Sequence, residues 1–196
     1  MIPRNVQITL VLLLVAILAS GIYILVLHRR TEEGLRRASD QRPVVAPVAG
    51  SDQTVKLTVA YDEDGVFRTR DVSVVVPAEP SARAKSVLEA LISYYLTKPS
   101  PHQLAEGSAV NNVFIVNQKL VVVDLNQSLA EGHPSGVMVE DFTLMSLIDT
   151  LATNLPQVQQ VKILINGKER ETLAGHADIR SIYSTAAIHK AVAQLQ

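Results

Sequence analysis

The chain contains no cysteine, and only 4% of its residues are aromatic. Without cysteine the fold must be stable without disulfides, and a thiolate metal site is excluded. Glycine-rich loops of the kind that cradle phosphate are also missing. A basic surplus is missing too, because six of the 18 Lys and Arg and three of the 19 Asp and Glu precede Ser51, which leaves 12 basic and 16 acidic residues from there on. Nucleic acid is therefore a poor partner.

A long uncharged run lies near the N-terminus. Residues 5–27 carry no charged side chain, and residues 10–27 are almost wholly apolar. About 20 apolar residues at 1.5 Å each cross a hydrocarbon core of about 30 Å. A cleaved signal peptide has an apolar core of about 7 to 15 residues, and no small-residue cleavage site follows Leu27. We therefore expect residues 1–30 to be a single-pass anchor with residues 6–27 in the membrane; a cleaved signal and a buried core helix are the alternatives.

The charges that flank this run bear on its orientation. Only Arg4 precedes it, whereas five arginines follow it: Arg29, Arg30, Arg36, Arg37 and Arg42. The positive-inside rule would keep the following domain in the cytoplasm, although long domains cross membranes largely regardless of charge. Residues 31–54 are polar, and Pro43 and Pro47 favour an extended backbone, so we expect a linker there.

The remaining residues suit one domain, expected over 55–183, with a tail at 184–196 that forms a short helix. Apolar periodicity predicts strands and helices in alternation. The expected elements are strands at 55–61 and 71–76 around a turn at 62–65, a helix at 82–97 capped by Ser81, strands at 112–116 and 119–125 around a turn at Asn117 and Gln118, a loop at 126–136, a helix at 139–154, and strands at 158–165 and 168–173. Asn166-Gly167 is the favoured pair for a type I′ hairpin turn, in which both central residues take positive φ. This order, β-β-α-β-β-α-β-β, predicts an α+β sandwich with the helices on one sheet face.

Few residues in the sequence suggest catalysis. Asp124, Ser128 and His133 have the residue types of a nucleophilic triad and lie within ten residues of one another, but no Gly-x-Ser-x-Gly elbow surrounds Ser128. The histidines at positions 102, 133, 176 and 189 lack the spacing of zinc ligands. We expect no catalytic residue, no metal and no cofactor. The alternative is a small-ligand-binding or hydrolytic domain that uses the loop after Asp124.

Several short motifs occur in a characteristic order. They are Val59-Ala60-Tyr61 at a strand end, Val121-Val122-Val123-Asp124-Leu125-Asn126 at another, Thr150-Leu151 before the strand 158–165, Asn166-Gly167 after it, and then Gly175-His176-Ala177-Asp178. With these motifs, residues 54–182 resemble the GerMN domain family of sporulation and germination proteins. The absence of a lipoprotein cysteine is a departure from the spore protein that gives the family its name.

The resemblance implies a non-catalytic module of the bacterial envelope that lies outside the cytoplasmic membrane and binds another envelope protein or assembles with itself. The residues at the matched positions are expected to be structural. Asp124 can accept backbone N–H groups of the loop that follows it, Thr150 can pack or bond within its helix, and Asn166, Gly167 and Gly175 supply positive φ.

Overall fold

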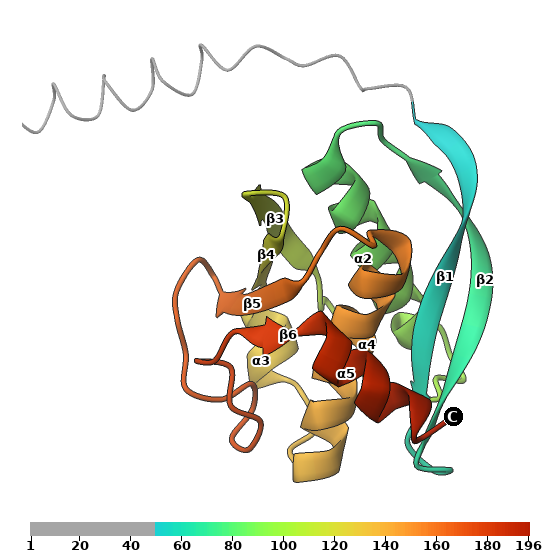
Figure 1. Cartoon of the computed structure of the whole chain (residues 1–196). Helices are drawn as coiled ribbons and strands as arrows, with labels where there is room; N and C mark the ends of the chain where they lie inside the picture. The colour runs from blue at the N-terminus through green and yellow to red at the C-terminus, as the bar shows by residue number, and fades with distance from the viewer. Residues whose placement is uncertain (1–49) are drawn as a thin grey trace, which may run out of the picture. The chain divides into compact units, whose positions relative to one another are not determined.

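The computed structural model describes residues 50–196, and Figure 1 shows their arrangement. Within this range, no helix combines the length and the apolar character that a membrane span requires. The predicted anchor at residues 6–27 and nearly all of the predicted linker lie outside the described residues. The last predicted linker residues, 51–54, belong to the first strand instead.

The described part is α+β, as predicted, but it contains two sheets. Its elements are β1 (Ser51–Tyr61), β2 (Val66–Val76), α2 (Pro80–Leu96), β3 (Val110–Val116), β4 (Leu120–Leu125), α3 (Gln127–Glu131), α4 (Val137–Asn154), β5 (Gln160–Ile165), β6 (Tyr183–Ser184) and α5 (Thr185–Ala193). One sheet is the antiparallel hairpin β1–β2, and the other has the order β3-β4-β5-β6. Helices α2 and α4 lie between the two sheets (Figure 1). The prediction of helices on one face of a single sheet is therefore wrong.

Helix α4 is the central element of the described part. Helix α2 buries one stripe at helical spacing, which consists of Ala84, Val87, Leu88, Leu91, Ile92 and Tyr95. In α4, by contrast, every residue from Phe142 to Leu151 except Met145 is buried, including several polar ones. A helix buried all round has neighbours on every side, and α4 contacts β1, α2 and α5. Its polar side chains must therefore find partners inside the protein.

The outer edge of β1 explains why the hairpin forms a sheet of its own. Backbone N–H groups of alternate β1 residues, and of the residue after its end, donate to side chains or backbone of other elements rather than to a further strand. The four bonds run from Lys56 to Asn154 Oδ1 (3.1 Å), Thr58 to Thr150 Oγ1 (2.9 Å), Ala60 to the Tyr95 hydroxyl (2.8 Å) and Asp62 to the Pro101 carbonyl (3.0 Å). Polar groups from α2, α4 and the connection between α2 and β3 thus close this edge.

The four-stranded sheet combines both kinds of pairing. Strands β3 and β4 are antiparallel, β4 and β5 are parallel, and β5 and β6 are antiparallel. The predicted turn between β3 and β4 is confirmed, with φ of 50° at Asn117 and 60° at Gln118. The parallel pair requires a crossover, which α3 and α4 provide. Helix α3 occupies part of the segment 126–136 that was expected to be a loop.

Two details of the predicted elements need correction. Helix α2 begins at Pro80, and its N-cap is Glu79 rather than Ser81. The Glu79 carboxylate accepts the N–H groups of Ser81 (2.9 Å) and Ala82 (2.6 Å), so the longer side chain reaches the first turn from one position earlier. Strand β2 is also longer than predicted and starts at Val66, directly after the confirmed turn at residues 62–65.

The predicted hairpin after β5 forms only its turn. Asn166 has φ of 50° and Gly167 has φ of 71°, which confirms the positive-φ pair. The returning strand at 168–173 is wrong, because a single bridge, between Ile165 and Lys168, joins this segment to β5, and Thr172 forms a bridge with Asp178 instead. Beyond it, the backbone N–H groups of residues 174, 176 and 177 bond to Glu140 of α4 instead of to β5. Strand β6 takes the place beside β5, and the predicted C-terminal helix is confirmed as α5, which packs on α4.

Candidate functional site

All four histidines of residues 50–196 bond to side chains of α4. His102 and His133 contact Thr143, His176 contacts Glu140, and His189 contacts Asp149. They come from the connection between α2 and β3, the loop after α3, the loop before β6, and α5. These contacts join four separate segments to one helix.

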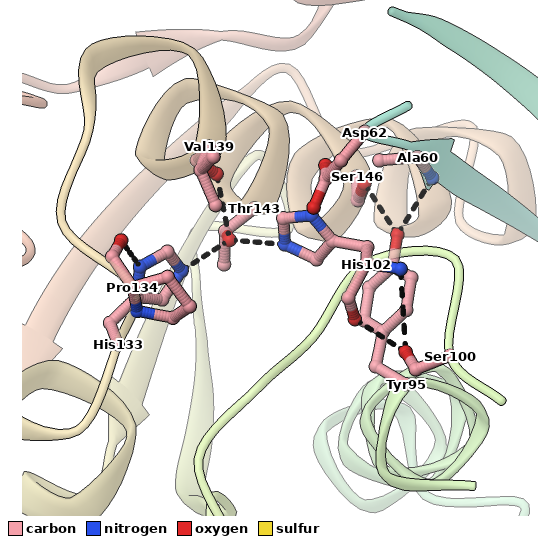
Figure 2. A network of polar contacts seen from close by, with 10 residues as sticks. All are labelled: Ala60, Asp62, Tyr95, Ser100, His102, His133, Pro134, Val139, Thr143 and Ser146. Carbon is pink, nitrogen blue, oxygen red and sulfur yellow. Dashed lines mark hydrogen bonds and ion pairs between the residues drawn. The ribbon is translucent and has the colours of Figure 1, made fainter. Parts of the chain in front are cut away.

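The Thr143 hydroxyl lies between two imidazole rings (Figure 2). Its oxygen is 2.6 Å from Nε2 of His102 and 2.6 Å from Nε2 of His133. On the far side of His102, Nδ1 is 2.7 Å from the Asp62 carboxylate. On the far side of His133, Nδ1 is 2.7 Å from the Pro134 carbonyl. We call the series Asp62, His102, Thr143 and His133 the Thr143 chain.

A second buried polar group adjoins the Thr143 chain. The Tyr95 hydroxyl accepts the Ala60 N–H at 2.8 Å and donates to Ser146 Oγ at 2.8 Å, and the ring of Tyr95 packs on His102 with centroids 4.7 Å apart (Figure 2). Burial raises the pKa of Tyr95 well above its usual range. Tyr95 therefore stays neutral and supplies both a donor and an acceptor between α2, α4 and β1.

The order carboxylate, imidazole, hydroxyl in the Thr143 chain is that of a catalytic triad. In this structure, however, His102 is 0% exposed and Thr143 is 1% exposed. The Thr143 oxygen already has His102, His133 and the Val139 carbonyl (3.2 Å) around it. A substrate carbonyl has no path to this hydroxyl, so the geometry supports a structural network rather than nucleophilic attack.

Glu140, one turn before Thr143, organises the loop before β6. Its fully buried carboxylate accepts the backbone N–H groups of Ala174 (3.0 Å), His176 (2.9 Å) and Ala177 (3.0 Å), and it also contacts His176 Nδ1 (2.9 Å). Burial alone would raise the pKa of Glu140, but these hydrogen bonds outweigh it and lower the pKa to about 2. The carboxylate is therefore ionised and holds the loop at neutral pH.

The structure brings three of the predicted structural residues together. Asp124 Oδ1 accepts the Gly167 N–H at 2.6 Å, and Asn111 Nδ2 donates to Asn166 Oδ1 at 3.1 Å. The donor to Asp124 is thus in the turn after β5, and not in the loop that follows Asp124 in the sequence. The reason is that β4 and β5 are parallel neighbours, so that their C-terminal ends meet at one edge of the sheet.

The other two predicted structural residues lie apart from this cluster. Thr150 Oγ1 accepts the Thr58 N–H of β1 at 2.9 Å, a contact between elements rather than within its own helix. Gly175 has φ of 127° in the loop that Glu140 holds. Asp124, Ser128 and His133 are not brought together, since Asp124 bonds to the turn after β5 and His133 faces Thr143.

Sequence reasoning missed the Thr143 chain because no local signal marks it. Asp62 and His102 are 40 positions apart, and His102 and Thr143 are 41 positions apart. Each of these residue types is also common in turns or helices. The useful signal is the polar content of α4, where Thr143, Ser146, Asp149 and Thr150 interrupt an otherwise apolar helix. Polar residues on every side of such a helix indicate buried hydrogen bonds.

The surface of the described residues has one broad groove. It has a volume of about 1100 Å³ and lies between the end of α2 and residues 98–107. A smaller groove of about 340 Å³ lies beside α3 and the turn after β5. Both are open rather than enclosed, and neither exposes the Thr143 hydroxyl, which is buried.

Strand β3 forms an open edge of the four-stranded sheet. Its sequence, VNNVFIV, has no charged residue and no proline. Phe114 is 53% exposed and Val116 is 41% exposed on its outer side. Within residues 50–196, its backbone receives two hydrogen bonds from outside the strands: Lys85 Nζ donates to the Asn111 carbonyl (2.9 Å), and Lys119 N–H of the following turn donates to the Val116 carbonyl (3.2 Å). Proteins usually protect an edge strand with charges, proline, bulges or a cover. In β3 such protection is confined to the first residues, where Lys85 contacts Asn111 and the register shifts between Val110 and Asn112, and residues 113–116 have neither charge nor proline.

Comparison with known proteins identifies the family. The Germane family model, described as sporulation and spore germination, matches residues 56–171. No curated protein matches the chain. The tandem GerMN domains of the sporulation protein GerM from Bacillus subtilis share 22% identity with a TM-score of 0.51, covering 67% of this chain and 45% of that one. The first GerMN domain of that protein shares 19% identity with a TM-score of 0.48, covering 66% and 94%.

The structural match to the tandem domains supports the same fold, and the family match extends over more than half of the chain. The resemblance predicted from the sequence motifs is thus confirmed. The chain belongs to the Germane family of sporulation and spore germination domains.

Proposed function

We propose that the protein is a membrane-anchored, non-catalytic module of the bacterial envelope that works by binding another protein through the outer edge of β3. Residues 6–27 anchor it, the polar residues after the anchor act as a spacer, and the domain lies outside the cytoplasmic membrane. The uncharged open edge of β3 is the observation that carries the proposal.

The other sheet edges of the described part are protected. Polar groups of α2, α4 and the connection between them close the edge of β1. Strand β2 carries Arg68, Arg70 and Asp71 along its length, and its Phe67 N–H donates to the Leu195 carbonyl (2.8 Å). Strand β6 is only two residues long. Charges and short length both oppose strand addition, so β3 is the edge best suited to it.

The chemistry of β3 defines the kind of partner. A strand edge offers a row of main-chain N–H and C=O groups, and another strand satisfies all of them at once. Phe114 and Val116 lie on the exposed side of the sheet and would contact apolar side chains of the added strand. We therefore propose an extended, largely uncharged segment of a second envelope protein as the occupant.

The catalytic alternative has less support. A hydrolase needs a nucleophile that a substrate can reach, together with a base within hydrogen-bond distance. The hydroxyl of Thr143 has the base but is buried, and Ser128 has no bond to His133 or Asp124. The broad groove near residues 98–107 could admit a small ligand, and turnover by the purified chain is the test for that alternative.

Site-specific photo-crosslinking in the native host tests the proposal. A photoreactive amino acid is placed in turn at positions 113, 114, 115 and 116, and at position 75 as a control, because Val75 is 59% exposed on β2. Strand addition predicts crosslinks from 114 and 116 to neighbouring residues of one partner peptide, with weaker crosslinks from buried 113 and none from 75.

The same experiment separates the alternatives. Crosslinks to a peptide of the chain itself would replace the second protein by self-assembly. Equal crosslinking at 75 and 114, or none at 114, would remove β3 as the contact surface. Hydrolysis of ester, peptide or glycan substrates by the purified chain that is lost in Thr143→Val or Ser128→Ala would overturn the non-catalytic role.

A further inference from the structure

The Thr143 chain contains more acceptors than its neutral groups can satisfy. A carbonyl oxygen can only accept, so His133 Nδ1, 2.7 Å from the Pro134 carbonyl, must carry a proton. A carboxylate also only accepts, so His102 Nδ1, 2.7 Å from Asp62, must carry one as well. If both imidazoles were neutral, both Nε2 atoms would then be bare acceptors.

Both Nε2 atoms are 2.6 Å from the same Thr143 oxygen. A hydroxyl has one proton, for which the Val139 carbonyl at 3.2 Å also competes, so Thr143 can donate to at most one of the two Nε2 atoms. The other contact would then place two lone pairs against each other in a buried site, at a distance where only a hydrogen bond is favourable. The observed geometry therefore requires one proton more than the neutral chain has.

The neighbours of the chain decide where this proton resides. Burial lowers the pKa of His133, and the charge of His102 lowers it further, so His133 is neutral and accepts from Thr143. The proton then belongs to the Asp62–His102 pair, which is also the end with a carboxylate. The other titratable groups that face the chain are Glu140 of α4, which is ionised, and Tyr95 of α2, which is neutral. No Lys or Arg side chain of residues 50–196 bonds to it.

These protons give every bond one direction. Asp62 accepts from His102 Nδ1–H, and His102 Nε2–H donates to the Thr143 oxygen. The Thr143 hydroxyl donates to His133 Nε2 at 2.6 Å, which is closer than the competing Val139 carbonyl at 3.2 Å. Loss of the extra proton removes the bond from His102 to Thr143. The ring nitrogens of His102 would then keep only the contact with Asp62, the residue that follows β1, and would lose the contact with α4.

We propose that the Thr143 chain is a proton-dependent latch that fastens the connection between α2 and β3, residues 97–109, to α4. The latch is closed when the Asp62–His102 pair holds its extra proton and opens when that proton leaves. Because the closed form binds one proton more than the open form, closure weakens as the pH rises.

The position of the latch gives it a consequence for the surface. Residues 98–100 and 103–107 line one side of the groove of about 1100 Å³, and His102, which belongs to the same connection, is buried beneath the surface. Asp62 N–H also bonds to the Pro101 carbonyl of the same connection (3.0 Å). Opening the latch would therefore release the groove wall from α4 and leave it held only by its two contacts with Asp62, which would loosen the wall and make the shape of the groove depend on pH.

The test combines imidazole NMR with amide exchange on the full chain in detergent, between about pH 5 and pH 9, the range in which imidazoles titrate. At low pH, the nitrogen shifts should show His102 with protons on both ring nitrogens and His133 neutral with its proton on Nδ1. As His102 loses its proton, the protection of the Asp62 and His102 amides should fall by about tenfold, as expected for one charged hydrogen bond. The Thr58 amide, which bonds to Thr150, should keep its protection.

Matched variants separate the latch from general loosening. Thr143→Ser keeps the hydroxyl and should keep the pH-dependent step, whereas Thr143→Val should abolish it and leave the two reporter amides weakly protected at every pH. His189→Gln, at a histidine whose side chain is 64% exposed, should leave the step unchanged. If the valine variant fails to fold because Thr143 is buried, the titration of the unmodified chain decides without it. A neutral His102 at every pH at which the fold persists, or deprotonation of His102 with no change in the reporter amides, would overturn the proposal.

Discussion

The outer edges of β1 and β3 face opposite requirements. Along β1, successive outward N–H groups each meet an oxygen of α4, of Tyr95 or of Pro101 at 2.8 to 3.1 Å. Along β3, the sheet ends at an uncharged strand with exposed Phe114 and Val116. Both strands are long enough to pair with a further strand on their outer edges. Within the described part of the chain, only the outer edge of β1 is covered by other elements along its length.

The difference separates what the domain needs to fold from what it offers to others. Leaving a buried backbone donor without a partner costs about 1 to 3 kcal/mol, so the edge of β1 must be closed inside the protein. The outer edge of β3 is partly exposed to solvent, and water can satisfy its backbone groups until the strand of a partner replaces the water. Substitutions at α4 should therefore change stability, and substitutions on the outer side of β3 should change association.

Among the buried polar residues of α4, substitution of Glu140 should cause the largest loss of stability. Glu140→Gln replaces one acceptor oxygen with a donor and removes the charge that four backbone N–H groups bind, three in the loop before β6 and that of Gly136. The pKa of Glu140, lowered from 4.5 to about 2, corresponds to roughly 3 kcal/mol of stability at neutral pH. Urea unfolding of the full chain in detergent at pH 7 should show a loss of this size. Asp141→Asn, at the neighbouring exposed acid, is the matched control and should change stability by less than about 0.5 kcal/mol.

The same carboxylate predicts how stability depends on pH. A pKa that is lower in the folded protein gives stability that is complete above the ordinary value of 4.5 and is lost as the pH falls towards 2. The unmodified chain should lose the roughly 3 kcal/mol over this window, whereas Glu140→Gln should lack this component. If both proteins lost the same amount of unfolding free energy as the pH falls over this window, Glu140 would not be the group that holds the loop.

Thr150 tests the closed edge of β1 directly. Thr150→Val keeps the shape of the side chain but leaves the buried Thr58 N–H without its acceptor. We expect a loss of about 2 kcal/mol in unfolding free energy, within the range for an unsatisfied buried donor. Thr150→Ser retains the oxygen and should recover most of the loss in the same unfolding measurement. An equal loss in both variants would point to packing rather than to the hydrogen bond.

Gly167 tests the turn after β5, a strand of the same sheet as β3. Its φ of 71° suits glycine, and a Cβ placed there would meet nothing within 4 Å. Gly167→Val should therefore cost only backbone strain, about 1 kcal/mol. Gly167→Asn, whose side chain tolerates this conformation better, should cost less. A thermal melt that is unchanged in the valine variant would contradict the strained turn.

Phe114 should give the smallest effect on stability. Phe114→Lys places a charge on an edge residue that is 53% exposed, and unfolding free energy should change by less than about 0.5 kcal/mol. The charge should nevertheless block strand addition, so crosslinking of the partner through position 116 should fall sharply. Met138→Lys, at a residue that is 59% exposed on α4, is the matched control and should leave crosslinking unchanged.

Much of the fold could be predicted from local patterns. The β1–β2 turn, both long helices, the turn at Asn117 and Gln118, and the positive-φ pair Asn166-Gly167 are all coded by neighbouring residues. The strand predicted after Gly167 does not form, because the residues that follow the turn bond to a part of the chain that is distant in sequence. Glu140, 34 residues away from Ala174, captures the loop that would otherwise have continued as a strand.

The candidate site was less accessible to sequence reasoning. Asp124 was predicted to accept backbone N–H groups, but its donor is Gly167, brought close by the parallel pairing of β4 and β5. The Thr143 chain depends on three segments whose meeting is set by packing around α4, and an isolated histidine gives no indication of such a meeting. The open edge of β3 became visible only once the strand order was known.

Amide exchange compared between β1 and β3 tests the central claim most directly. It is measured on the purified full chain and on the same chain in native envelope membranes. We predict that the Thr58 and Ala60 amides exchange slowly in both samples, and that the β3 amides that do not face β4 exchange rapidly in the purified chain but slowly in the membranes. Rapid exchange of these β3 amides in both samples, or slow exchange in both, would contradict a contact module that works through the open edge of β3.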